Sequence, residues 1–314
     1  MKKTPLDRRI EAFHQLGTGS DRVTPLTFCW KIPERRFDAL QEAVLSFLGG
    51  RSVLELDNDR ATDQNITPNG MIVPKRDKVL EYNLVVRRFA EIINSMAIGH
   101  LIESWHVPLN VRVKYGELDP ASLDRDHPTE HLHSDSWAGE SAESVTVHIP
   151  LLGDVRRNCV KTAYPPSDFE EAWLGPRPTY AEGSQDIAHR YRPIDFVTPG
   201  GALLLMDFAT LHASTLAPGA RTRVSIDTTF VLRKLGAVAE VIHPWRAEER
   251  VSHVVLSGIG ETHLLYFPDG PGQRVDSRGG FKHPTNLRLV RIDGGVGERP
   301  DVYHTDTLRE GEQP

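Results

Sequence analysis

The chain has little of what defines several large classes of protein. Its 314 residues include only two cysteines, Cys29 and Cys159, too few for a disulfide framework or a structural zinc finger. No run approaches the roughly 20 apolar residues that span a bilayer, and no apolar stretch of secretory length follows the basic N-terminus. Few thiols fit a reducing compartment. We therefore expect a soluble, cytoplasmic protein without a membrane partner.

An excess of basic residues is missing as well. The chain has 37 Lys and Arg residues against 43 Asp and Glu residues, which gives a net charge of −6. A nucleic-acid-binding protein normally carries a basic excess, so we expect no nucleic-acid partner. Hydrophobic residues make up 39% of the chain, an ordinary value for a globular protein.

The sequence pattern divides the chain into three segments, which we expect to form one compact domain. Residues 1–106 are predicted to be a mainly helical segment that packs on the core. Residues 107–233 are predicted to be the β core, and residues 234–314 a C-terminal extension. The two outer segments are large enough to build a substrate cover or a homodimer interface.

Apolar residues at helical spacing predict two helices in the first segment. One runs from Pro33 to the glycine pair Gly49–Gly50, and a longer one covers residues 78–105. A short strand is expected at residues 53–56 between them.

The middle segment alternates between apolar and polar residues, which is typical of half-buried strands. The predicted strands lie at residues 110–115, 144–152, 158–164, 202–208 and 220–232. Turn residues rather than helices separate these strands, so an antiparallel sandwich or barrel is favoured. Residues 165–192 are rich in Pro, Gly and aromatic residues and are predicted to be an irregular insertion that covers a site.

The densest group of potential metal ligands is the sequence HLHSD at residues 131–135. His133 and Asp135 are two residues apart, so on an extended segment their side chains point to one side and can bind one metal. His212 is the best third ligand. Two histidines and one carboxylate form a facial triad, which leaves three positions of octahedral Fe(II) free for a bidentate cosubstrate and dioxygen. The alternative, in a chain with 14 histidines, is that these are ordinary core or surface residues.

A polar strand face follows eleven residues after His212. In the sequence RTRVSID at residues 221–227, Arg223, Ser225 and Asp227 alternate with apolar residues. This pattern suits a barrel whose polar interior holds a small charged ligand. Arg223 offers a planar fork to a carboxylate, and Ser225 adds a hydroxyl. The alternative is a surface strand with an Arg–Asp pair.

The order and spacing of these residues resemble the Fe(II)/2-oxoglutarate-dependent oxygenases. They are most similar to the phytanoyl-CoA dioxygenase-like branch, which includes bacterial natural-product oxygenases. The resemblance covers roughly residues 107–233 and rests on His133-x-Asp135, the 77 positions from Asp135 to His212, the Pro-Gly-Gly turn at residues 199–201, and Arg223-x-Ser225.

The resemblance implies a double-stranded β-helix core, which is a jelly-roll or cupin-like fold, with Fe(II) bound by His133, Asp135 and His212. It also implies that Arg223, helped by Ser225, binds the distal carboxylate of 2-oxoglutarate. Such an enzyme uses O2 to oxidise a small polar metabolite or natural-product intermediate, and it releases succinate and CO2. Related halogenases lack the metal-binding carboxylate, so Asp135 favours hydroxylation, with desaturation and ring closure as variants.

Two other functions remain open. His131 extends the motif to H-x-H-x-D, so His131, His133, Asp135 and His212 could form the site of a zinc-dependent hydrolase. Ser136, however, stands where the hydrolase motif has another histidine. The second alternative is a non-catalytic, cupin-like binding protein.

Five further residues could contact the substrate or support the metal ligands. They are His131, Trp137, Arg112, Lys114 and His148. Trp137 follows the metal motif, and His148 faces away from the apolar side of its strand. For each of the five, a core or solvated position without a functional role is the alternative.

Overall fold

Two antiparallel β-sheets form the centre of the fold. The computed structural model describes residues 3–17, 19–58, 66–67, 69–74, 76–96, 98–118, 123, 126–232 and 250–266, and the short pieces 273–274, 281–282, 288–291 and 304–307. In the larger sheet the strand order is β1-β2-β8-β5-β10-β3-β11, and β4 also pairs with β10. These strands are β1 (Asp21–Thr24), β2 (Thr27–Lys31), β3 (Ile102–His106), β4 (Asn110–Lys114), β5 (Ser144–Gly153), β8 (Ala202–Asp207), β10 (Arg223–Leu232) and β11 (Arg250–Ser252).

The smaller sheet lies across from the larger one and has the order β7-β6-β9. Its strands are β6 (Asn158–Tyr164), β7 (Arg192–Ile194) and β9 (Leu211–Leu216). An antiparallel bridge between His133 and His212 adds the metal-motif segment to its edge. The strands therefore form a jelly-roll core, which confirms the antiparallel sandwich or barrel that the alternating pattern predicted and the fold that the resemblance implied.

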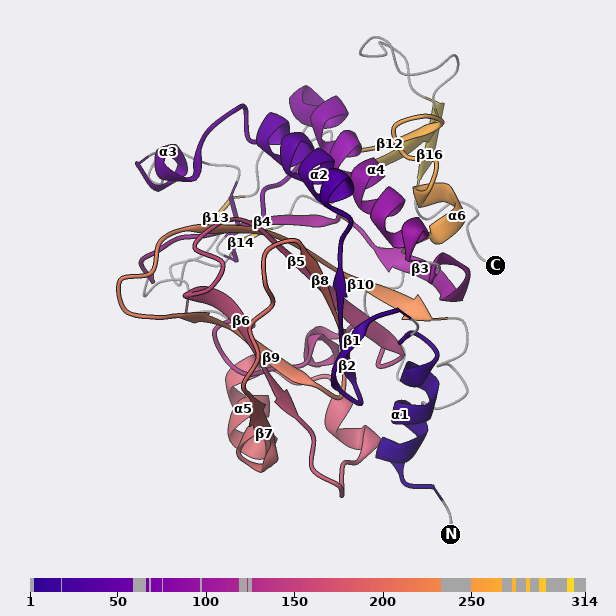
Figure 1. The fold of residues 1–314 in the computed structure, drawn as a ribbon, viewed down its shortest axis with the longest axis vertical. Helices are drawn as coiled ribbons and strands as arrows, with labels where there is room; N and C mark the ends of the chain where they lie inside the picture. Colours follow the sequence, from indigo (N-terminus) through magenta and orange to yellow (C-terminus); the bar gives the residue numbers. More distant parts are fainter. Residues whose placement is uncertain are drawn as a thin grey trace.

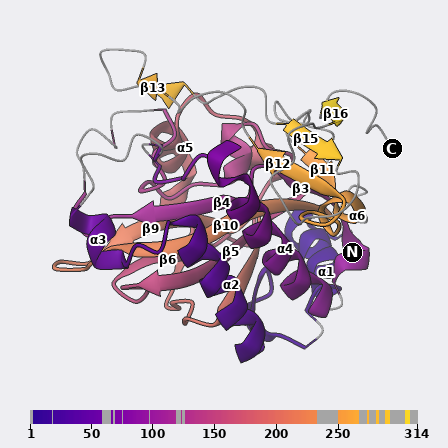
Figure 2. The same ribbon diagram turned by 90° about the horizontal axis from the view of Figure 1, so that it is seen from above.

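Helices α2 (Glu34–Phe47) and α4 (Val79–Ser95) cover the face of the larger sheet that points away from the smaller sheet (Figures 1 and 2). The apolar stripe of α2 is buried there and includes Leu40 and Phe47. On β10, Val224 and Ile226 are fully buried, so the apolar side of this strand packs under the helices rather than facing solvent. Burial of each large apolar side chain contributes about 1.5–3 kcal/mol. The other side of β10 faces the interior between the sheets.

The first segment departs from its predicted pattern at two places. Residues predicted as a strand at 53–56 form helix α3 (Val53–Asn58) instead. The reason is local, because Ser52 and Glu55 form reciprocal side-chain-to-backbone hydrogen bonds of 3.2 and 2.7 Å, the arrangement of a capping box. The helix predicted over residues 78–105 ends at Ser95, and the short helix η2 (Gly99–Leu101) and strand β3 of the larger sheet follow it.

The remaining elements flank this core. They are α1 (Pro5–His14), η1 (Arg76–Lys78), η2 (Gly99–Leu101), η4 (Asp135–Ala138), η5 (Glu171–Leu174), α5 (Tyr180–Ile187), η6 (Ala188–Arg190), α6 (His253–Leu256), β12 (His263–Tyr266), β13 (Gln273–Arg274), β14 (Phe281–Lys282), β15 (Arg288–Arg291) and β16 (His304–Thr307). Much of the predicted C-terminal extension lies outside the described residues. Within the described ranges, the helices are all too short or too polar to cross a membrane.

A buried ion pair joins the N-terminal helix to the core. Arg9 of α1 donates hydrogen bonds of 3.0 and 3.1 Å to Asp207 at the end of β8, and of 2.7 Å to Glu171. A further hydrogen bond of 2.9 Å reaches the carbonyl of Ala142. Arg9 is 2% exposed and the Asp207 side chain is fully buried. Because water does not reach either group, each charge is stabilised by its ion-pair partner instead of by solvent.

We expect Arg9→Met to destabilise the fold strongly, because it leaves the Asp207 carboxylate buried without its cation. Breaking one side of a buried pair costs about 3–5 kcal/mol. Lys3→Met is the control, since it removes an ion pair to Glu11 whose side chains are 60% and 64% exposed. An exposed pair is worth less than about 1 kcal/mol. Urea unfolding of both variants measures the difference, and equal losses would contradict the assignment.

Candidate metal centre

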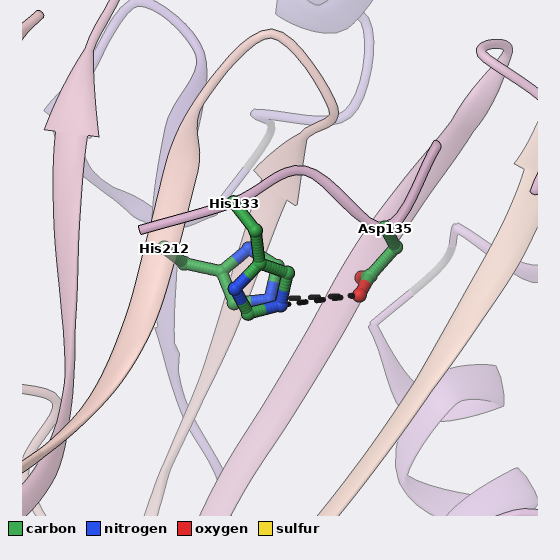
Figure 3. A group of neighbouring side chains, drawn as sticks. All are labelled: His133, Asp135 and His212. Carbon is green, nitrogen blue, oxygen red and sulfur yellow. Dashed lines mark ion pairs between the residues drawn. The ribbon is translucent and has the colours of Figure 1, made fainter. Parts of the chain in front are cut away.

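His133, Asp135 and His212 come together in the interior between the sheets. One ligand atom from each lies within 4.8 Å of the others. The Nε2 atoms of His133 and His212 are each 3.7 Å from Oδ1 of Asp135, and both rings face this carboxylate (Figure 3). The structure thus brings the three sequence-predicted ligands into one cluster, although 77 positions separate Asp135 from His212.

Backbone pairing fixes the two histidines. The N–H of His133 donates to the carbonyl of His212 at 2.9 Å, and the N–H of His212 donates back at 2.8 Å. Nδ1 of His133 lies 2.6 Å from the carbonyl oxygen of His131. Because a carbonyl can only accept, Nδ1 carries the proton, and Nε2 presents its lone pair to the cluster. His131 thus orients His133 through its main-chain carbonyl.

Asp135 is held so that one oxygen faces the histidines. It is the first residue of η4, whose N-cap residue is Ser134. The hydroxyl of Thr146 on β5 donates to Oδ2 of Asp135 at 2.8 Å, which leaves Oδ1 directed toward the two rings. Thr146 was not predicted from the sequence, because its contact depends on the pairing of distant segments.

The electrostatics of the cluster favour metal binding. Burial raises the pKa of Asp135, but His212, His133 and the Thr146 hydroxyl outweigh it and hold the pKa well below its usual range. Burial and the neighbouring His133 lower the pKa of His212 to about 4. At neutral pH the site therefore presents a carboxylate and a neutral His212 imidazole, the forms that ligate metals.

The three residues fit a divalent first-row transition metal. Such an ion binds imidazole nitrogen and carboxylate oxygen at about 2.1 Å, so neighbouring ligand atoms lie about 3 Å apart. The observed 3.7 Å separations need to shrink only slightly. Nε2 of His133 is buried and has no hydrogen-bond partner in the described part of the chain, which is the state expected of a metal ligand.

The segment 165–192 is more regular than its composition predicts. It contains η5 and helix α5, which begins after Thr179, whose hydroxyl accepts a hydrogen bond of 3.1 Å from the N–H of Glu182. Its aromatic residues are buried rather than displayed to solvent. The ring of Tyr180 stacks on His133, with centroids 4.0 Å apart and planes at 17°.

Trp137 packs against Tyr180, the residue that stacks on His133. It is fully buried, and its Nε1 donates a 2.8 Å hydrogen bond to the carbonyl of Trp173. Its ring lies 6.5 Å from that of Tyr180. Trp137 of η4 therefore packs in the core against α5. A core position is the alternative that the sequence left open for it.

We expect Gly183→Ala to disturb this packing, because the added Cβ would lie 2.5 Å from Cε3 of Trp137. Overpacking of this kind costs about 1–3 kcal/mol. Gly200→Ala is the control, since a Cβ there meets nothing within 4 Å. Thermal unfolding of both variants tests the prediction. A more stable Gly183→Ala protein would show that helix propensity outweighs the clash.

The interior between the two sheets carries several polar groups that have no hydrogen-bond partner in the described part of the chain. Among the residues described, the buried atoms that lack hydrogen bonds include both ring nitrogens of His148, Nε of Arg223, Oγ of Ser225 and Oγ1 of Thr162. Arg223 is 1% exposed, and its Nη1 donates a hydrogen bond of 3.2 Å to the carbonyl of Asn158. An unmet buried polar group costs about 1–3 kcal/mol. A cluster of them therefore indicates a binding site for a polar ligand.

Two other basic residues of this interior are already neutralised. Arg112 donates to Asp227 through Nε and Nη2, both at 2.7 Å. Lys114 donates to Glu130 at 2.8 Å and to Thr129 at 2.7 Å. Their side chains are therefore engaged within the protein. The sequence showed that Arg112 and Lys114 share a strand face but could not reveal these carboxylate partners.

Burial lowers the pKa of Arg223 and of His148, which pair with no carboxylate among the described residues. It lowers the pKa of Arg223 to about 10, although Asp227 acts in the opposite direction. Burial, followed by the charge of Arg223, lowers the pKa of His148 to about 3. At neutral pH, Arg223 is a cation that needs an anion, and His148 is a neutral ring.

No family model matches the chain, and no curated protein matches it. Among solved structures, it is similar to the non-heme alpha-ketoglutarate-dependent carbocyclase SnoK from nogalamycin biosynthesis, with 12% identity over 80% of this chain and 99% of that chain and a TM-score of 0.40. The epimerase SnoN, in complex with Fe3+, alpha-ketoglutarate and nogalamycin RO, is 15% identical over 77% of this chain and 93% of that chain, with a TM-score of 0.42. EctD from S. alaskensis, with 2-oxoglutarate and 5-hydroxyectoine, is 14% identical over 74% of this chain and 78% of that chain, with a TM-score of 0.39.

We expect His133→Ala, Asp135→Ala and His212→Ala each to abolish Fe(II) binding, because each removes one of three ligands. His131→Ala should retain it, since the carbonyl that orients His133 belongs to the main chain. Metal content after anaerobic reconstitution measures the effect. Greater iron loss in His131→Ala than in His212→Ala would contradict this ligand set.

Proposed function

We propose that the protein is a non-haem Fe(II)/2-oxoglutarate-dependent oxygenase. The observation that carries the proposal is the presence, in one barrel interior, of a metal-ligand triad and a buried arginine that pairs with no carboxylate among the residues the structure describes. Asp135 is the carboxylate of the triad, and Arg223 supplies the free guanidinium. A ligand that chelates a metal at one end and carries a carboxylate at the other suits both features.

Different residues would bind the metal, bind the cosubstrate and orient the metal ligands in such a reaction. His133, Asp135 and His212 would hold Fe(II), which supplies oxygen activation coupled to the decarboxylation of 2-oxoglutarate to succinate and CO2. Arg223 would pair with the distal carboxylate, and Ser225 would donate its unmet hydroxyl to it. Thr146 keeps Asp135 oriented, and the Tyr180 ring shields one face of His133 from water.

Within this class, we propose hydroxylation of a small polar metabolite or natural-product intermediate as the outcome. The supporting feature is Asp135, which occupies the metal position that a halogenase would leave open for halide. The partner is then a small molecule.

The zinc hydrolase that uses the H-x-H-x-D string fits the geometry less well. Such a site needs the His131 side chain as a ligand. Within the ranges that the structure describes, the cluster of potential ligands contains His133, Asp135 and His212 but not His131. A hydrolase also leaves Arg223 without an anion to bind.

The proposal is tested by 2-oxoglutarate binding and turnover. Arg223→Ala should weaken binding by about 2–5 kcal/mol, because the distal carboxylate loses its buried charge partner. Arg221→Ala is the matched control, since Arg221 is exposed and precedes β10. Anaerobic titration of the Fe(II)-loaded variants gives the affinities, and succinate release gives the turnover. Equal losses would show that the wrong arginine was chosen, and an intact affinity in both would overturn the cosubstrate assignment.

A further inference from the structure

His148 has a buried ring that nothing described in the protein satisfies. It lies on β5, is 4% exposed, and neither Nδ1 nor Nε2 has a hydrogen-bond partner among the described residues. A neutral imidazole has one donor and one acceptor. Leaving both unmet inside a protein is unfavourable, so the position calls for a ligand.

The neighbours of His148 explain why it stays unpaired. In the sheet it lies opposite Asp227 of β10 and Leu204 of β8. The carboxylate of Asp227 already accepts hydrogen bonds of 2.7 Å from Nε and Nη2 of Arg112 and of 2.9 Å from Asn110. Leu204 offers no polar atom. Asp227 and Leu204 thus leave the His148 ring able to bind a ligand in the interior between the sheets.

The register of β5 places His148 between the two ends of the proposed cosubstrate site. Two residues before it, Thr146 holds the metal ligand Asp135. Two residues after it, Pro150 lies opposite Ser225, and Gly153 at the end of the strand lies opposite Arg223. Side chains on one strand face are about 7 Å apart. His148 is therefore one step from the metal centre along the path toward Arg223.

We propose that His148 is a cosubstrate-binding residue, whose ring N–H donates to a carboxylate oxygen at the metal-side end of a 2-oxo dicarboxylate. Arg223 takes the other carboxylate of the same molecule. This inference rests on the proposed function. Because His148 and Arg223 each bind one end of the ligand, the two residues together select a dicarboxylate of matching length.

The protonation state of His148 supports the assignment. Burial and the charge of Arg223 lower the pKa of His148 to about 3, so the ring is neutral in the empty site. A neutral ring can offer an N–H to the carboxylate without adding a second buried cation beside Arg223. It also keeps the net charge of the pocket matched to a single distal carboxylate.

Three variants test the role of His148. His148→Leu removes both nitrogens and keeps an apolar side chain of similar size, while His148→Gln keeps an amide donor. His189→Leu is the matched control, because His189 is exposed on η6. The first readout is the thermal midpoint of the metal-free, ligand-free protein. The second is the dissociation constant of 2-oxoglutarate for the Fe(II)-loaded protein under anaerobic conditions, followed by the metal-to-ligand charge-transfer band of the chelate.

We expect a contrast between the two readouts. His148→Leu should have a thermal midpoint equal to or above that of the wild type, because it removes two unmet polar atoms from the interior. Its dissociation constant for 2-oxoglutarate should rise about 10- to 100-fold, the usual effect of losing a hydrogen bond to a charged group. His148→Gln should recover part of the affinity, and His189→Leu should match the wild type in both readouts.

Other outcomes separate this inference from the proposed function. If His148→Leu binds 2-oxoglutarate like the wild type while Arg223→Ala does not, the role of His148 is refuted and the oxygenase assignment stands. If His148→Leu lowers the thermal midpoint and His148→Gln restores no affinity, His148 is a structural residue and the inference fails. If the iron-loaded wild type shows no saturable 2-oxoglutarate binding, the proposed function itself fails.

Discussion

The antiparallel ladder between β5 and β10 is the constraint on which the rest of the site depends. It runs from Val231 opposite Ser144 to Arg223 opposite Gly153. The register shifts once, between Val224 and Ser225. Because side chains alternate along each strand, this pairing sends the apolar residues under α2 and α4 and the polar ones into the space between the sheets. A slip by one residue would bury Arg223 and His148 against the helices and remove the polar interior.

A second pairing closes the site from the opposite sheet. The bridge between His133 and His212 joins the metal-motif segment to β9, so the two histidines come together through main-chain hydrogen bonds. The smaller sheet thus supplies two ligands, and Thr146 of the larger sheet orients the third, Asp135. Metal affinity and the packing of the two sheets are consequently coupled, since the ligands belong to segments that meet only in the folded protein.

The interior charges form a simple pattern once the pairs are assigned. Arg112 is matched by Asp227 and Lys114 by Glu130. This leaves Arg223 as a buried cation that donates a hydrogen bond to the neutral carbonyl of Asn158, beside a triad that contains one carboxylate. Such an imbalance is unfavourable in an empty protein and becomes favourable when an anion binds. It is the physical basis for a site that selects a ligand with a free carboxylate.

The sequence alone determined the features that follow from local spacing. The alternation along the strands, the single residue between His133 and Asp135, and the polar face of β10 with Arg223 all depend on neighbours in the chain. The alternation predicted an antiparallel sandwich or barrel, and the resemblance implied the jelly-roll core. A local signal was also missed, because Ser52 and Glu55 form the capping box that makes α3 a helix. Capping contacts act through side chains and escape a reading based on apolar periodicity.

Only the tertiary structure decided which polar residues are free and which are engaged. Arg112 and Asp227 are 115 positions apart, and their pairing removes Arg112 from the ligand site. The sequence placed His148 on the polar side of its strand, but its isolation follows from its register opposite Asp227. Tyr180 stacks on His133 because α5 docks beside the metal motif. Each of these facts depends on long-range strand and helix packing, which local spacing does not encode.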